Sequence, residues 1–113
     1  MIFLDFETYY DKEYSLKKMP TWQYIRDRRF QLLGCAVWTP GKNLEYLHKK
    51  DECKKYFEAY YINSVPVCCH NAAFDCAILY HLWGFTPGYI YDTKLMARYL
   101  IAQGILPPDQ TTS

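Results

Sequence analysis

The sequence predicts one α/β domain built on a mixed β-sheet, with three antiparallel strands followed by two parallel strands and with helices packed on them. Three observations lead to this prediction. Strand-like segments dominate the first 48 residues, around one polar connection. After residue 50, segments with helical periodicity alternate with short apolar runs, a pattern typical of parallel strands joined by crossover helices. The length of 113 residues suits one hydrophobic core and is too short for two ordinary domains.

The first predicted strand is IFLDFET, residues 2–8, which is rich in β-branched and aromatic side chains. Because strand residues alternate between faces, both faces of this segment carry large apolar groups, and we expect a central strand. One face holds Ile2, Leu4 and Phe6, and the other holds Phe3, Asp5 and Glu7.

A long polar connection, residues 9–30, follows the first strand. After Pro20 it contains a predicted short helix over residues 22–27, with Thr21 as its cap. The next elements are a strand, a turn and a third strand at residues 32–39, 40–43 and 44–48. We expect the first three strands to form an antiparallel meander.

The second half alternates helices with strands. Residues 51–63 place apolar side chains at helical spacing between lysines, with Asp51 as the predicted cap. The run VPVCCHN, residues 65–71, suits a buried strand. From Asp75, an apolar stripe predicts a helix that packs through one face, formed by Ile78, Leu79 and Leu82. The last two elements are the strand GYIYD, residues 88–92, and the helix TKLMARYLIAQ, which ends at Gly104.

Composition excludes several classes of protein. The chain is 50% apolar and 19% aromatic, which indicates a globular protein and not a disordered one. No apolar run reaches membrane-spanning length, and the segment MIFLDFET lacks the features of a secretion signal, so we expect a cytoplasmic protein. The net charge of +1 argues against a broad polyanion-binding surface, so any nucleic-acid contact is expected to be local.

The five cysteines form no C-x-x-C pair and are expected to be small buried hydrophobes. The neighbouring Cys68, Cys69 and His70 do not predict a zinc site, because adjacent strand residues point to opposite faces.

The predicted strand order brings three acids together. Right-handed crossovers would lay the fourth and fifth strands parallel beside the first, so that Asp75 lies near Asp5 and Glu7. Taken alone, Asp75 has an alternative role as a helix-capping acid. Three converging carboxylates would repel one another unless a hard cation such as Mg²⁺ or Mn²⁺ neutralised them. Two such ions are a known device for hydrolysing phosphodiesters.

Several motifs resemble those of one nuclease superfamily. DFET at 5–8, NAAFD at 71–75 and DT at 92–93 resemble the motifs of DEDD-superfamily 3′-5′ exonucleases, which have a ribonuclease H-like fold. Within that superfamily the chain is most similar to the exonuclease domain of bacteriophage family A DNA polymerases. Members of that group resemble the stretches DFETYYDKEYSLKKM, YIRDRRF and DTKLMARYL. If a phage encodes the chain, the bacterial host cell is its expected location.

The resemblance implies roles for particular residues. Asp5, Glu7 and Asp75 correspond to three of the four acids that bind metal and carry the catalysis in the superfamily. Residues implied to contact substrate or to support those acids are Thr8, Asn71, Phe74 and Asp92. For Asn71 a cap or turn role is the alternative, and for Asp92 a cap together with Thr93.

The third motif of the superfamily, Tyr-x-x-x-Asp or His-x-x-x-Asp, has no counterpart. It supplies the fourth acid and the residue that orients the attacking water. The only later acid, Asp109, follows Ile105 by four residues, in place of a tyrosine or histidine. We therefore expect residues 1–113 to be a single exonuclease-like domain that is C-terminally truncated.

The resulting functional expectation is a proofreading-type 3′-5′ exonuclease, which hydrolyses DNA 3′ ends with Mg²⁺ or Mn²⁺ and is weak or inactive as this chain alone. One or two ions, and a single-stranded DNA 3′ end, are the expected ligands. The alternative is a non-catalytic module that binds nucleic acid or a partner. A second polypeptide or a downstream domain that completes the fold, or self-association, is expected in either case. A nuclease acting on RNA stays open, because the metal acids do not distinguish sugars.

Overall fold

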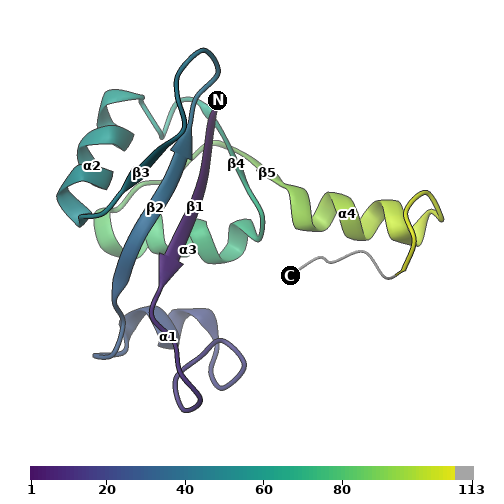
Figure 1. Ribbon diagram of the computed structural model, residues 1–113, viewed down its shortest axis with the longest axis horizontal. Helices are drawn as coiled ribbons and strands as arrows, with labels where there is room; N and C mark the ends of the chain where they lie inside the picture. Colours follow the sequence, from purple (N-terminus) through teal and green to yellow (C-terminus); the bar gives the residue numbers. More distant parts are fainter. Residues whose placement is uncertain (109–113) are drawn as a thin grey trace.

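The computed structural model describes residues 1–108 and has the predicted mixed α/β architecture. Five strands form one sheet in the order β3-β2-β1-β4-β5, so that β1 is central (Figure 1). β1 pairs antiparallel with β2 and parallel with β4, and β4 pairs parallel with β5. The predicted meander followed by two parallel strands is therefore confirmed.

The strands are short apart from β1 and β2. Their bounds are β1 Ile2–Thr8, β2 Leu32–Trp38, β3 Glu45–Leu47, β4 Pro66–Cys69 and β5 Tyr89–Asp92. The register pairs Asp5 with Ala36 and Glu7 with Gly34, and a bulge follows between Glu7 and Thr8. This bulge lies at the carboxyl end of β1, next to the acids that the sequence singles out.

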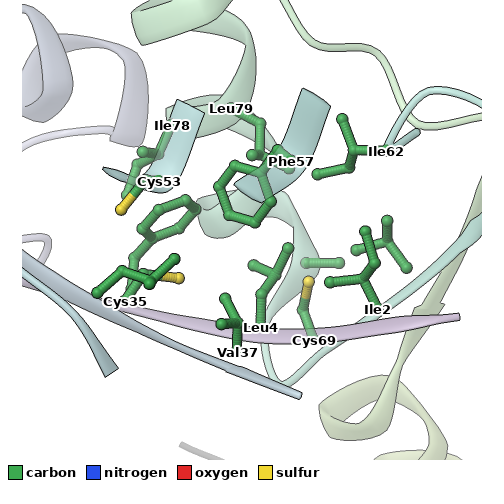
Figure 2. Packing of buried hydrophobic residues seen from close by; sticks show 14 of the residues in the cluster. Ile2, Leu4, Cys35, Val37, Cys53, Phe57, Ile62, Cys69, Ile78 and Leu79 are labelled. Atoms are coloured by element: carbon green, nitrogen blue, oxygen red, sulfur yellow. The ribbon is translucent and has the colours of Figure 1, made fainter. Parts of the chain in front are cut away.

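Two helices cover one face of the sheet and enclose the core. The helices are α1 Thr21–Arg26, α2 Lys50–Ala59, α3 Ala72–Trp83 and α4 Thr93–Ala102. Phe57 of α2 is fully buried between the sheet and α3, with its ring centroid 6.0 Å from that of Phe6 and 5.8 Å from that of Trp83. Figure 2 shows Leu4 and Val37 of the sheet facing Ile78 and Leu79 of α3 across this ring.

Two predicted helix starts and one predicted helix end are wrong. Thr21 is the first residue of α1 and not its cap, because Pro20 holds the cap position without a side-chain hydrogen bond. Asp51 lies in the first turn of α2, and Lys49 is at the cap position. The helix predicted over 51–63 ends at Ala59, since Tyr61 adopts a positive φ of 56°.

Within residues 1–108, no helix packs on the second face of the sheet (Figure 1), and we call it the open face. Alternation along the strands and the strand register place on it Phe3, Asp5, Glu7, Gly34, Ala36, Trp38, Tyr46, Cys68, Tyr89 and Tyr91. Cys69, by contrast, faces the core and is 3% exposed. Adjacent Cys68 and Cys69 thus point to opposite faces, as predicted.

Helix α4 leaves the edge of the sheet and projects away from the rest of the domain (Figure 1). None of its ten residues is buried. No helix in the described range has the length and apolarity needed to cross a membrane.

Candidate functional site

Asp5 and Glu7 project from the open face of β1, and both side chains are exposed. Partial burial raises the pKa of Glu7 above its ordinary value, and the neighbouring Asp5 carboxylate raises it further. The two carboxylates therefore repel each other, so that an added cation would be attracted between them.

Asp75 lies in the first turn of α3 and is only 2% exposed. Its Oδ1 accepts a hydrogen bond from the backbone N–H of Phe6, at 3.3 Å. Because Phe6 stands between Asp5 and Glu7, this bond joins α3 to the segment of β1 that carries both acids. The predicted proximity of Asp75 to the acids of β1 is thus present.

Burial raises the pKa of Asp75 to about 8. The hydrogen bond from Phe6 acts in the opposite direction, and the nearby Asp5, Cys76 and Asp92 raise the pKa further. Without a bound cation, burial therefore favours the protonated form of Asp75 at neutral pH. A cation beside it would favour the carboxylate.

The three acids do not surround one common point. Within residues 1–108, no three His, Cys, Asp or Glu side chains are grouped closely enough to hold a metal ion. The reason is that Asp75 directs Oδ1 to the β1 backbone, on the buried side, while Asp5 and Glu7 face outward. The predicted convergence on one ion position is thus incomplete. Asp109 lies outside the described residues.

The donor set nevertheless suits a hard divalent cation. Carboxylate oxygens are the ligands that Mg²⁺ and Mn²⁺ prefer, and burial together with the nearby Asp5 carboxylate raises the pKa values of Glu7 and Asp75, a shift that a bound cation would oppose. Asp5 and Glu7 are the residues that would hold such an ion, with Asp75 as the third acid.

Asp92 caps two helices with one carboxylate. Its oxygens accept hydrogen bonds from Lys94 N at 2.9 Å and Leu95 N at 3.2 Å in α4. They also accept from Asn71 N at 3.2 Å and Ala72 N at 2.8 Å at the start of α3. Partial burial alone would raise the pKa of Asp92, but these four N–H groups outweigh it and hold the pKa below its ordinary value.

Asn71 occupies the cap position of α3 with a left-handed backbone, φ 95°. Its side chain makes no capping hydrogen bond, so the cap role predicted as the alternative for Asn71 is filled by the Asp92 carboxylate. Asp92 thereby fixes the start of the helix that carries Asp75, and Thr93 begins α4.

Thr8 and Phe74 lie on the wall of a pocket beside Glu7. The Thr8 hydroxyl is 2.9 Å from the Tyr24 hydroxyl, which also donates to the carbonyl of Tyr9. The Tyr24 ring lies 6.0 Å from that of Phe74 and stacks on the buried Tyr14 ring at 4.4 Å. These tyrosines attach the connection 9–30 to the end of β1.

The pocket has a volume of about 640 Å³, within the usual range of small-molecule sites. Aromatic and aliphatic side chains line it together with polar ones, and three lysines stand among them: Lys12, Lys17 and Lys18. Sequence reasoning missed these lysines and Tyr24. The signal was present in DKEYSLKK, where the basic residues follow the D-x-E strand closely.

Comparison of the chain with models of protein families, with curated proteins and with solved structures found no match.

Proposed function

We propose that the chain is a 3′-5′ exonuclease domain of the DEDD type, with a ribonuclease H-like fold, which hydrolyses phosphodiesters at DNA 3′ ends. The observation that carries the proposal is the hydrogen bond from Phe6 to Asp75, which ties a buried acid to the strand segment bearing Asp5 and Glu7. The strand order with β1 central supports the proposed fold. The motifs DFET, NAAFD and DT, which resemble those of the superfamily, contribute the same residues.

The chemistry proposed for the site divides between a metal and the chain. Bound Mg²⁺ or Mn²⁺ would supply activation of water and stabilisation of the leaving oxygen. Asp5 and Glu7, near the carboxyl end of β1, would hold the ion. Asp92 keeps the first turn of α3, and with it Asp75, against the β1 backbone.

The pocket beside Glu7 supports nucleotide binding. Aromatic rings stack on nucleobases without selecting a sequence, and Tyr10 and Phe74 supply such rings here. Ammonium groups attract phosphates, and Lys12, Lys17 and Lys18 stand around the same pocket. A terminal nucleotide seated in this pocket would bring its phosphate next to Glu7.

Hydrolysis by residues 1–113 is expected to be slow, because only three of the four acids implied by the resemblance are found. We expect a 5′-labelled single-stranded DNA to be shortened stepwise from its 3′ end with Mn²⁺, and the reaction to stop with a chelator. Asp5→Asn should lower the rate by about 100-fold or more, because an acid that would bind the ion is lost. Gel analysis of the products measures both effects.

Asp51→Asn is the matched control, since it removes one exposed acid in α2, away from the site. It should leave the rate unchanged. Equal rates for the wild-type chain and Asp5→Asn would show that the cleavage comes from a contaminating nuclease and would contradict the proposed function.

The second candidate is a non-catalytic module that binds single-stranded nucleic acid, and the lysine-lined aromatic pocket favours it specifically, because binding there needs no metal. DNA binding that is retained after metal removal, without any shortening of the strand, would decide for this candidate.

Binding of single-stranded DNA is expected to weaken as salt rises, because phosphate contacts release counterions. Replacing Lys12, Lys17 and Lys18 together by Gln should lower the slope of log affinity against log salt by about 2, at roughly 0.7 per lost contact. Fluorescence anisotropy over a salt series measures this slope.

The control for this measurement is the triple replacement by Gln of three lysines on α2, Lys50, Lys54 and Lys55, which makes the same change in net charge. A similar loss of slope in both triple variants would mean that the pocket has no special part in binding.

A further inference from the structure

Helix α4 presents a basic and apolar surface to solvent. Leu95, Met96 and Tyr99 are 59%, 45% and 63% exposed, and no residue of the helix is buried. Lys94 and Arg98 lie one turn apart on the same side of the helix, and α4 contains no acid.

The open face of the sheet is aromatic and negatively charged, and so complements the apolar and basic surface of α4. Five aromatic residues lie on it, from four of the five strands: Phe3, Trp38, Tyr46, Tyr89 and Tyr91. Its only charged side chains are those of Asp5 and Glu7, and none of its residues is Lys or Arg. A groove of about 330 Å³ runs over it between Trp38, Leu44 and Cys68.

We propose that the chain forms a symmetric dimer in which α4 of each copy lies on the open face of the other, with Leu95 and Tyr99 against the aromatic groove and Lys94 and Arg98 toward Asp5 and Glu7. The proposal goes beyond the proposed function and does not rest on it, but α4 of the second copy would compete with a metal ion for Asp5 and Glu7.

The charges on the open face favour α4 of a second copy over nucleic acid as its binding partner. An aromatic sheet face can stack bases, but such surfaces also supply basic groups for the phosphates. The charged side chains of the open face are the carboxylates of Asp5 and Glu7, and His70 and Thr93 add polar groups at the edge of the groove. Without a bound cation, the two carboxylates repel phosphates and attract the ammonium and guanidinium groups of α4.

The dimensions of the two surfaces agree. A helix of ten residues is about 15 Å long, and five strands span about 19 Å. Since the same two surfaces exist on each copy, a two-fold axis satisfies both at once. Because each copy buries both its α4 and its open face, the buried area is twice that of a single docked helix. A stable interface buries roughly 800 Å² per partner.

Analytical ultracentrifugation tests the dimer over a concentration series that reaches roughly 100 µM. The wild-type chain should sediment as a dimer at the upper end. Leu95→Asp and Tyr99→Asp should sediment as monomers. Tyr80→Asp, an equal change at an exposed tyrosine of α3 on the helix-covered side, should stay dimeric. A monomeric wild type, or dimeric α4 variants, would overturn the proposal.

A cross-link tests which surfaces meet. In Tyr99→Cys, mild oxidation should join the introduced thiol to Cys68 on the open face of the second copy, and peptide mass spectrometry should identify this pair. Linkage mainly to another cysteine would overturn the arrangement. Amide hydrogen exchange completes the test, because protection of the open face should rise with protein concentration; protection that appears only with single-stranded DNA would mean that the face binds nucleic acid instead.

Discussion

Asp75→Asn is expected to stabilise the metal-free protein at alkaline pH and to remove the hydrolytic activity proposed above. The pKa of Asp75 is raised to about 8 by burial, whereas an aspartate in an unfolded chain titrates near its ordinary value of about 3.9. Between these values the folded state keeps a proton that the unfolded state has lost, so the free energy of unfolding falls as pH rises toward 8.

The free energy of unfolding of the asparagine variant does not fall in this way, because its amide is neutral at every pH. Its side-chain oxygen can still accept the hydrogen bond from the Phe6 N–H. Wild type and variant should have similar stability near pH 4. Above pH 8 the variant should be more stable by several kcal/mol, at about 1.4 kcal/mol for each unit of pKa difference. Urea unfolding at a series of pH values measures this difference.

The control for the Asp75 prediction is Ile78→Val, a small change at a buried apolar residue of the same helix. Its difference in stability from wild type should be the same at every pH, because no titratable group is altered. A constant difference between wild type and Asp75→Asn from pH 4 to 9 would mean that Asp75 is not the buried protonated acid described above.

Asp92→Ala is expected to destabilise the fold more than removal of an ordinary helix cap. Loss of one cap costs about 1 kcal/mol. The Asp92 carboxylate serves two helices and four N–H groups, so a loss of about 2–4 kcal/mol is expected. Thermal and urea unfolding measure it.

Asp92→Asn and Asp92→Ser separate the parts of this effect. The asparagine keeps an oxygen acceptor without the charge, and the shorter serine can cap α4 but should not reach Asn71. We expect the order of stability wild type, Asn, Ser, Ala. Equal stability of the serine variant and wild type would show that the bonds to α3 contribute nothing.

The strand order could be predicted because it depends on patterns that are strong in this chain. Alternation along residues 2–8 identified the central strand, and helical segments between the later short strands indicated parallel pairing. The helix starts were predicted less well. Thr21 and Asp51 looked like caps by residue type, but the cap positions lie one residue before Thr21 and two residues before Asp51.

For the candidate site, the sequence predicted that Asp75 lies near the acids of β1 but did not predict how its side chain is directed. The D-x-E spacing and the predicted strand order placed Asp75 near β1. No sequence pattern shows that its Oδ1 accepts a hydrogen bond from the Phe6 N–H, or that it does not face the same ion position as Asp5 and Glu7. The lysines of the pocket were missed because they lie in a connection, where side-chain direction has no periodicity. For Asp92 a cap was the alternative to a supporting role, and its hydrogen bonds to the start of α3 could not be predicted, because Asn71 and Ala72 lie 21 and 20 residues away in the sequence.

The attachment of the connection 9–30 has a consequence for motion. Tyr14 and Tyr24 hold it through ring stacking and through hydroxyl bonds to backbone and Thr8, while the sheet ladder lies elsewhere. Opening this segment would also expose Tyr14, Tyr24 and Ile25, which are 0%, 2% and 6% exposed, whereas β1 could stay paired to β2 and β4. We therefore expect the connection and α1 to unfold locally as one cooperative unit and not residue by residue. Such an opening would move the wall of the lysine pocket while the acids of β1 stay in place.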